Sequence, residues 1–432
     1  AVFFCIFHKN GFHRINIFFL FLTHSLTPDA LGITKAKGTL LFDESGKIYI
    51  DAISSWYTAV YGHCHPILIE AAYNQMRQLD QVVFAGFTHE PAVKLTEKII
   101  PLLPYGQNRV FFSENGSTAV DIALKIAIQY FHNKGDKRKV FVAFEEGFHG
   151  DTFGAMSVSG LSVYNGAFED FFIEVKRIPV PTEENIDQVL QHLKNILDKG
   201  DVAAFIYEPL VQGAAGMKMH EAKNLCQILR LCKQYDVLKI ADEVMTGFGK
   251  TNTLFASEQV TISPDIICLS KALTAGMLPM ALTTCTEKIF SAFLSEDNAK
   301  GFFHGHTYTA NPIACSVASA AIDLYQSKII ENGKLKIEKS HDNFLNVLMH
   351  DKRVMNERTN GVILAFELNT PIDRYGKKRN EIFQFFMEKG VFIRPLGNTI
   401  YLTPPFITSE KQMEKVYETT LECIEKFGEK NE

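Results

Sequence analysis

One lysine, Lys271, directly follows an apolar stretch and has no charged neighbour close to it in the chain. Residues 266–269 are apolar and typical of a buried strand, and small or apolar residues occupy 272–276. Lysine is rarely buried without a partner. A desolvated lysine amine has a lowered pKa and is nucleophilic, as in lysines that form Schiff bases. The position therefore predicts either a structural ion pair or a nucleophilic amine.

A second unusual position is the pair of carboxylates at Asp242 and Glu243, which follows the strand-like stretch 237–241. A carboxylate at the end of a buried strand is costly unless it meets a cation. Lys271 is the obvious cation, because it stands at the end of what should be a nearby strand. The alternative is a protonated ring nitrogen of a cofactor that lies between the two side chains.

Two glycine-containing stretches follow other predicted strands. After the strand 109–113, Gly116 permits close approach of the backbone and Ser117 can cap the next helix, whose free N–H groups would hold a phosphate. The plainer interpretation is an ordinary capped helix. After the strand 139–145, Phe148 stands beside glycines, where it is either a platform for a flat ring or an ordinary loop aromatic. No GxGxxG sequence follows the first strand, which argues against a dinucleotide.

These groups together match the needs of one cofactor, pyridoxal phosphate. It requires a lysine for its aldehyde, a carboxylate for its pyridinium nitrogen, an aromatic ring for its face and backbone donors for its phosphate. Lys271, Asp242, Phe148 and the Gly116–Ser117 pair supply one of each, and every one of them follows a predicted strand. Ligands of open parallel sheets bind outside the carboxyl ends of the strands. A structural ion pair alone would leave the remaining features as unrelated coincidences.

The elements that position these groups form a series of alternating strands and helices. The series predicts an α/β fold, with a mostly parallel sheet and helices on both faces. The expected strands are 109–113, 139–145, 202–209, 237–244 and 265–270, and the expected helices are 117–131, 185–197 and 222–235.

The pattern changes on either side of this series. An Asp-Glu-Ser-Gly turn within 39–52 predicts a β-hairpin before it. Strands at 361–368, 390–395 and 399–405, set between helices at 381–389 and 409–426, predict a smaller α+β lobe after it, packed with the hairpin. We therefore expect three parts, namely an N-terminal segment with the hairpin (1–62), a large cofactor-binding domain (63–325) and a small C-terminal domain (326–432).

Composition excludes several classes of protein. The 432 residues carry a formal net charge of −5 without a block of basic residues, which argues against nucleic acid as a partner. The eight cysteines are scattered singly, which favours reduced thiols and a cytoplasmic location. Neither histidine pair, His63 with His65 nor His304 with His306, has an acidic or cysteine cluster beside it, so no metal site is expected.

The first 28 residues are rich in phenylalanine and contain no acidic residue. Their apolar run around 17–22 is too short to cross a bilayer, so no membrane association is expected. The stretch is interpreted either as a targeting peptide or, for residues 1–22, as an atypical segment that does not belong to the authentic chain.

From about residue 35 onward the sequence resembles the class III, fold-type I pyridoxal-phosphate aminotransferases. The strings ADEVMTGFGKTNTLFASE and PDIICLSKALTAG carry the resemblance to the class. A closer resemblance, to members that use S-adenosylmethionine as amino donor and 8-amino-7-oxononanoate as acceptor in biotin biosynthesis, rests on longer strings. These are SSWYTAVYGHCHP, VVFAGFTHEPAVKL, GFHGDTFGAMSVSG, EPLVQGAAGMKMH, HGHTYTANPIAC and GVFIRPLGNTIYLTPPF.

The resemblance implies roles in cofactor binding. Lys271 bonds to the cofactor aldehyde and moves the proton between the substrate carbon and the cofactor, while Asp242 holds the pyridinium nitrogen. Gly116 and Ser117 bind the phosphate. In a homodimer with active sites at the interface, Thr307 reaches the phosphate across the interface, and His306 lies beside it.

The resemblance also implies a substrate site. Arg394 takes the substrate carboxylate, for which a planar guanidinium is suited. The remaining lining residues are Trp56, Tyr57, Phe148, Gly305 and Tyr401.

The sequence departs from the usual family pattern at four places. Tyr57 replaces a second tryptophan, Phe148 replaces a tyrosine and His306 replaces a proline. A His-Pro-Tyr/Leu-Thr stretch expected near residues 19–22 reads Phe-Leu-Phe-Leu, which removes the basis for a role of Phe21.

Other functions remain open from the sequence. An ω-amino acid aminotransferase of the ornithine or aminobutyrate type, or an aminomutase, would share the class motifs, and a relative that takes lysine as amino donor would share the closer ones as well. A protein of another kind, a non-catalytic α/β binding protein, would use Lys271 only in an ion pair.

Overall fold

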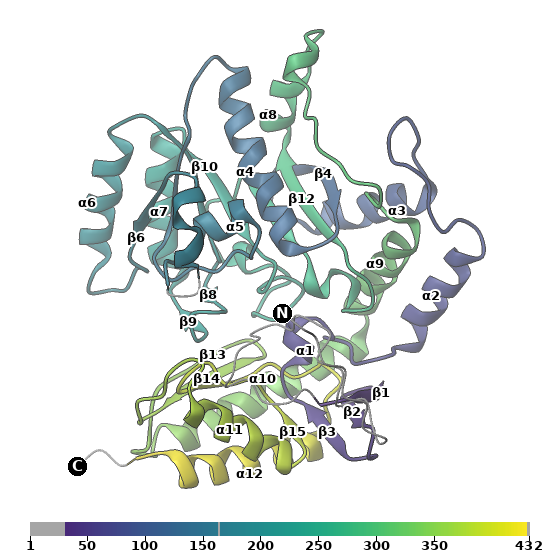
Figure 1. The fold of residues 1–432 in the computed structure, drawn as a ribbon, viewed down its shortest axis with the longest axis vertical. Coiled ribbons are helices and arrows are strands. Elements are labelled where there is room, and N and C mark those ends of the chain that lie inside the picture. The colour runs from purple at the N-terminus through teal and green to yellow at the C-terminus, as the bar shows by residue number, and fades with distance from the viewer. Residues whose placement is uncertain (1–30, 163–164, 430–432) are drawn as a thin grey trace, which may run out of the picture. The chain divides into compact units, whose positions relative to one another are not determined.

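The computed structural model describes residues 31–162 and 165–429 as two compact units. The large unit spans Pro66–Ser327, and the small unit combines the chain before Pro66 with the chain from Lys328 onward. Figure 1 shows the course of the chain through both units. The N-terminal segment 1–22, including Phe21, lies outside the described residues.

A seven-stranded sheet forms the centre of the large unit. Neighbours are parallel except at β12, which runs antiparallel to both β4 and β11. The predicted mostly parallel sheet is confirmed, although β12 and β6 were not predicted. In spatial order the strands are β4 (Gln107–Ser113), β12 (Ala281–Thr286), β11 (Ile266–Leu269), β10 (Leu238–Asp242), β7 (Val202–Tyr207), β5 (Val140–Phe144) and β6 (Val175–Ile178).

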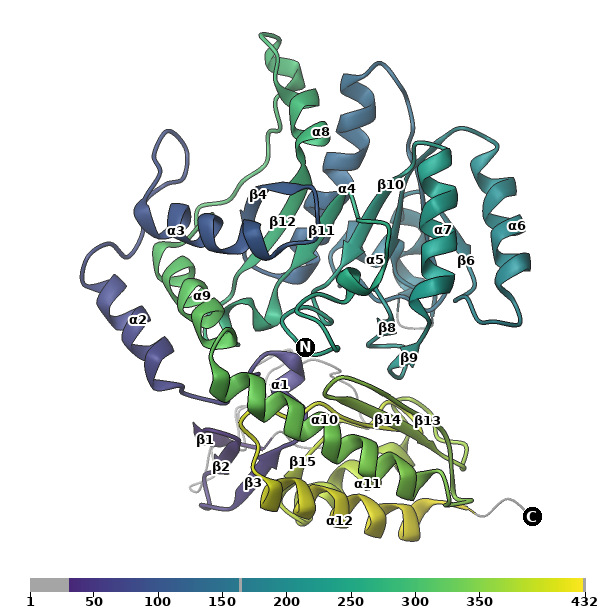
Figure 2. The ribbon, with the colours of Figure 1, turned by 180° about the vertical axis from the view of Figure 1, so that it is seen from behind.

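Helices lie on both sides of this sheet, as the sequence predicts. The helix α4 lies in front of the strands in Figure 1, whereas α7 lies in front of them in the reverse view of Figure 2. The helices of the large unit are α2 (Pro66–Met76), α3 (Glu90–Ile99), α4 (Gly116–Asn133), α5 (Phe153–Val158), α6 (Ile186–Leu197), α7 (Ala222–Gln234), α8 (Glu287–Phe290) and α9 (Pro312–Tyr325). A short hairpin, β8 (Val211–Gln212) with β9 (Lys218–Met219), completes it.

The spacing of apolar residues explains which face each helix buries. In α6 the buried positions are Val189, Leu193, Ile196 and Leu197, which lie on one side of a helix with 3.6 residues per turn. The strands β5, β7, β10 and β11 are buried at every position, because helices cover both of their faces. The carboxyl ends of these strands are therefore fixed by a close-packed core.

The small unit contains two small sheets. The predicted hairpin is confirmed, with Gly46 at φ +85° in its turn, and β15 joins it in parallel next to β3, so the C-terminal lobe packs with the hairpin. The first sheet is β1 (Ile33–Lys37), β2 (Leu40–Asp43), β3 (Ile48–Asp51) and β15 (Val391–Phe392), and the second is β13 (Val354–Asn360), β14 (Ile363–Leu368) and β16 (Thr399–Leu402). The helical segments are α1 (Ser54–Tyr57), α10 (Lys328–Leu348), α11 (Lys377–Glu388) and α12 (Glu410–Phe427).

The cysteines and the apolar character of the helices complete the description. The seven cysteines in the described ranges are free thiols, six of them buried. Over the same ranges, the structure contains no helix with the length and apolar character needed to cross a membrane.

Candidate active site

Lys271 lies where the sequence places it, immediately beyond the buried strand β11. It begins the short 3-10 turn Lys271–Thr274 with φ +44°, a left-handed conformation that a lysine rarely adopts. Part of its surface is accessible, but burial of the amine lowers the pKa of Lys271, against the opposing influence of the Asp242 and Glu208 carboxylates. The amine is therefore biased toward the neutral, nucleophilic form.

Asp242 ends the neighbouring strand β10 and is buried. Parallel pairing sets Asp242 opposite Cys268, three residues before Lys271, so both side chains leave the same edge of the sheet. One carboxylate oxygen accepts from the backbone N–H of Val244 at 3.0 Å, and the other accepts from Nδ1 of His149 at 2.7 Å. Sequence reasoning missed His149, although it stands directly after Phe148.

Two more buried polar side chains that the sequence did not single out lie beside this group. Glu208 accepts hydrogen bonds from the backbone N–H groups of Phe148 (3.0 Å) and Gly213 (2.9 Å), and burial raises the pKa of its carboxyl to about 7. Gln212 is fully buried, yet neither end of its amide has a hydrogen-bond partner. Buried amides are normally satisfied, so Gln212 indicates a polar ligand group at this place. The signal in the sequence was that Glu208 and Gln212 are polar residues in an otherwise apolar stretch.

The start of α4 has the properties of an anion site, but its cap differs from the prediction. Asn115, not Ser117, caps the helix, because its backbone is extended and its side chain accepts from the N–H of Thr118. A Cβ on Gly116 would lie 2.7 Å from a methyl carbon of Val244, so only glycine lets the helix begin beside the end of β10. The first-turn amides of Gly116 and Ser117 have no partner within the helix and point positive dipole charge outward.

Gly150 supports this helix start from the next loop, and its replacement tests the geometry. Gly150→Ala would strain a backbone at φ +129° and drive the new methyl group into the Ser117 side chain. We expect about 2–3 kcal/mol lower free energy of unfolding and a weaker affinity for the cofactor. Gly135→Ala is the control, because its φ is +80° but nothing lies within 4 Å of the added carbon. Urea unfolding and cofactor titration of the apoprotein check both; equal effects would refute the role of Gly150.

The remaining residues predicted to contact the cofactor are exposed or lie in the loop 304–309. Phe148 is 42% exposed, while its backbone is fixed by Glu208, so its ring is available for stacking. Nε2 of His306 lies 2.7 Å from a carboxylate oxygen of Glu114, and the carbonyl of the exposed Thr307 accepts from the Gln81 side chain at 2.6 Å. Gly305, in the same loop, is exposed. The proposed roles of these residues remain predictions.

The small unit brings four of the predicted substrate residues together. The Arg394 guanidinium lies 4.9 Å from the centre of the Trp56 ring, and the rings of Tyr57 and Tyr401 are 5.9 Å apart. Burial raises the pKa of Tyr401 to about 12, and the Tyr57 hydroxyl and the nearby arginines limit this rise. Trp56 and Tyr57 belong to α1, whose residues have left-handed backbone angles that cost roughly 1–2 kcal/mol each.

Three of the four residues in the two histidine pairs contact other side chains. In the first pair, Nε2 of His63 donates to Asp51 at 2.8 Å. In the second, His304 contacts the Lys125 amine at 2.8 Å and His306 pairs with Glu114. No set of three or more His, Cys, Asp or Glu side chains in the described ranges is arranged to hold a metal ion.

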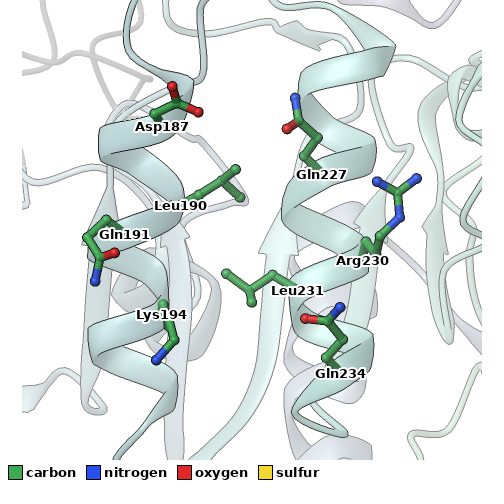
Figure 3. Close-up of a pocket in the computed structure, with 8 residues that line it drawn as sticks. All are labelled: Asp187, Leu190, Gln191, Lys194, Gln227, Arg230, Leu231 and Gln234. Atoms are coloured by element: carbon green, nitrogen blue, oxygen red, sulfur yellow. The ribbon is translucent and has the colours of Figure 1, made fainter.

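A surface cavity of about 330 Å³ lies elsewhere, between α6 and α7. Figure 3 shows Leu190 and Leu231 pointing toward each other across it, with polar side chains around them. It contains none of the predicted site residues and no buried ionisable group. This cavity is thus separate from the side chains at the carboxyl ends of the central strands.

The fully buried lysine Lys250 makes the stability of the protein depend on pH. It is fully buried and donates to the carbonyl of Gly247 at 2.7 Å, and burial together with the Lys271 charge lowers its pKa to about 7. The unfolded chain keeps this proton up to about pH 10.5. The unfolded state therefore binds more protons between pH 7 and 10.5, and the free energy of unfolding rises with pH across this window.

Lys250→Met should abolish that rise. Between pH 7 and pH 9 the wild-type protein should gain about 2 kcal/mol relative to the variant. Urea unfolding at both pH values measures the difference, and Lys218→Met, at a half-exposed lysine of β9, is the control. Parallel pH profiles of the wild type and Lys250→Met would contradict the assignment.

Comparison with known proteins agrees with this geometry. The sequence matches the profile of the family described as Aminotransferase class-III over residues 23–424. The chain belongs to the class III aminotransferases, which are pyridoxal-phosphate enzymes, and the predicted fold type and enzyme class are confirmed.

Two curated relatives named adenosylmethionine-8-amino-7-oxononanoate aminotransferase are similar over most of the chain. The relative from Synechococcus elongatus is 39% identical over 425 residues, which cover 95% of this chain and 99% of the relative. The relative from Aquifex aeolicus is 38% identical over 406 residues, covering 89% of each.

Solved structures of two transaminases superimpose on most of this chain. The adenosylmethionine-8-amino-7-oxononanoate aminotransferase of Methanocaldococcus jannaschii superimposes with a TM-score of 0.87 at 34% identity, covering 93% of this chain and 94% of that one. An amine transaminase from an uncultivated Pseudomonas species, in its pyridoxal-phosphate-bound form, superimposes with a TM-score of 0.90 at 25% identity, covering 96% and 100%.

Proposed function

We propose that this chain transfers an amino group from S-adenosylmethionine to 8-amino-7-oxononanoate, producing 7,8-diaminononanoate for biotin biosynthesis in the cytoplasm. The observation that carries the proposal is similarity over nearly the whole chain to relatives that share one name for this activity. The arrangement of Lys271 and Asp242 at adjacent strand ends supports the reaction type.

The residues at the sheet edge fit pyridoxal phosphate, and each has a task. The cofactor, when bound, supplies an aldehyde and an electron-withdrawing pyridinium ring. Asp242 would hold the ring nitrogen, because His149 and the Val244 N–H fix the position of its carboxylate. The unpartnered Gln212 amide offers a hydrogen bond to a polar ring substituent.

Proton transfer falls to Lys271. Its amine, with a lowered pKa, accepts the proton that leaves the α-carbon of the donor and delivers a proton to the acceptor carbon in the second half of the reaction. The N–H groups of Gly116 and Ser117 bind the phosphate and so fix the cofactor against this amine. The Phe148 ring stacks on the face of the cofactor.

Substrate recognition involves the small-unit group. Arg394 binds the substrate carboxylate through its two-pronged guanidinium, and the Trp56 ring restricts the guanidinium from one side. Within the small unit, the side chains of Tyr57 and Tyr401 line the substrate site.

Assembly into a homodimer completes the proposal. Large apolar side chains on and around α2 and α3 are unusually exposed for a monomer, which favours a covered surface here. They are Ile67, Ile69, Tyr73, Met76, Val83, Phe87 and Val93. In this dimer Thr307 binds the phosphate of the partner's cofactor. Sedimentation velocity should give a dimer.

Separate addition of the two substrates tests the function. The donor alone should convert the absorbance of the bound cofactor from the aldehyde to the amine form, and the acceptor alone should then restore it. A conversion by lysine but not by S-adenosylmethionine would replace the donor. Conversion by ornithine or 4-aminobutyrate alone would favour an ω-amino acid aminotransferase. If the protein showed no cofactor absorbance after reconstitution, the proposal that it is an enzyme would be refuted.

A further inference from the structure

The turn that carries Trp56 has an unusual backbone that its own sequence does not explain. Ser54, Ser55, Trp56 and Tyr57 have φ values of 49°, 45°, 67° and 73°, so four consecutive residues without glycine are left-handed. Such residues visit this region singly and at a cost, and they persist only where the surroundings over-determine them. Contacts outside the turn must hold it.

The main contact is the carboxylate of Asp51, at the end of β3. Asp51 is fully buried, and one of its oxygens accepts from the backbone N–H of Ile53 at 3.2 Å. The other accepts from the Ser55 hydroxyl at 2.9 Å and from Nε2 of His63 at 2.8 Å. A single buried anion therefore binds the residue before the turn, a residue within it and a residue beyond it.

Both ends of this arrangement are anchored to the rest of the small unit. His63 exchanges two backbone hydrogen bonds with Gly38, at 2.7 and 3.0 Å. On the opposite side, the hydroxyl of the buried Ser54 donates to the carbonyl of Thr403 at 2.7 Å. The turn can relax to right-handed geometry only by breaking these contacts together.

We propose that Asp51, Ser55 and His63 act as positioning residues, which hold the left-handed turn and thereby set the Trp56 ring against the Arg394 guanidinium. The ring is 42% exposed, so the turn that carries it contributes to its position. The inference rests on the proposed function, since Arg394 is there the residue that binds the substrate carboxylate. A released turn would withdraw the Trp56 ring from the Arg394 guanidinium.

Two substitutions at Ser55 test whether its hydroxyl acts by holding the left-handed turn. Ser55→Ala removes the hydroxyl and leaves a residue that resists φ +45°, so the turn should relax. Ser55→Gly also removes the hydroxyl, but glycine adopts this φ without strain and should keep the turn. Trp56 is the only tryptophan of the chain, so intrinsic fluorescence reports its position without any substrate.

We expect Ser55→Ala to shift the Trp56 emission and increase its quenching by acrylamide, and Ser55→Gly to stay close to wild type. His63→Ala should resemble Ser55→Ala, which gives a second route if one variant folds poorly. In steady-state kinetics Ser55→Ala should raise KM for the acceptor about tenfold, with kcat within about twofold, because binding rather than proton transfer is disturbed.

Asn356→Ala is the matched control. Asn356 is another left-handed residue of the small unit, at φ +54°, and it lies in the irregular part of β13. Its replacement should lower stability without changing Trp56 fluorescence or KM. The proposal is overturned if Ser55→Ala and His63→Ala leave the fluorescence unchanged, or if Ser55→Gly disturbs it as much as Ser55→Ala. Because fluorescence needs no substrate, failure of the proposed reaction would be recognised separately.

Discussion

Lys271→Ala should reduce kcat/KM by about 10⁴-fold, because it removes the only group assigned to move the proton. The variant should also lose the covalent bond to the cofactor. In the wild type, borohydride should fix the cofactor to the protein and add its mass to the peptide that contains Lys271. In Lys271→Ala, borohydride should add no mass, while the cofactor remains bound through the other contacts.

Two controls distinguish this result from general damage. Lys194→Ala removes a half-exposed lysine of α6 that pairs with Asp198, and it should leave turnover and borohydride fixation unchanged. Added methylamine should restore part of the turnover of Lys271→Ala, because a free amine can replace the missing base. Retention of more than a tenth of the wild-type turnover, or continued borohydride fixation, would show that another amine carries the reaction.

Asp242→Asn should reduce kcat by roughly 10²–10³-fold, the usual loss when one pre-organised electrostatic group is removed from an active site. Asparagine keeps the size and one acceptor oxygen, but it has no charge to hold a protonated ring nitrogen. It also changes the acceptor of the hydrogen bond from Nδ1 of His149, 2.7 Å away. Single-turnover absorbance measurements with the donor should show slow conversion of the cofactor and little change in its affinity.

The same sheet has a comparable carboxylate at the amino end of one of its strands. Asp265 precedes β11 and accepts from the backbone N–H of Lys239 at 2.9 Å, in addition to an ion pair with the Lys239 amine. Asp265→Asn should lower stability but leave the rate of cofactor conversion within about twofold. If both variants slowed the conversion equally, the effect of Asp242 would be structural.

The sequence predicts those parts of the site that depend on one strand and the residues after it. Lys271 and Asp242 were identified because apolar runs mark buried strands, and parallel neighbours end at one edge. The hydrogen bond of Asp242 with His149 was not predictable, because it joins residues 93 positions apart in the chain. The unsatisfied Gln212 amide likewise appears only once the surrounding core excludes water.

Local backbone geometry limited prediction in two other places. Ser117 was expected to cap α4, but a cap is decided by which residue has extended backbone angles, and that residue is Asn115, at φ −154°. The turn at Trp56 gives no sequence signal, because left-handed turns are usually marked by glycine or asparagine and this one contains neither. Its conformation depends on Asp51 and His63, which precede and follow it.

The reversed strand β12 has a consequence for how the lysine moves. Because β11 and β12 are antiparallel neighbours, with Leu269 opposite Leu282, the connection that carries Lys271 leaves the sheet and returns to it at the same edge. The Ser270 hydroxyl closes its base by donating to the carbonyl of Met280 at 2.8 Å. A backbone tethered at both ends cannot travel, so the amine must reach its successive positions by rotation of side-chain torsions alone. The Lys271 side chain thus changes its torsion angles while the backbone that carries it stays in place.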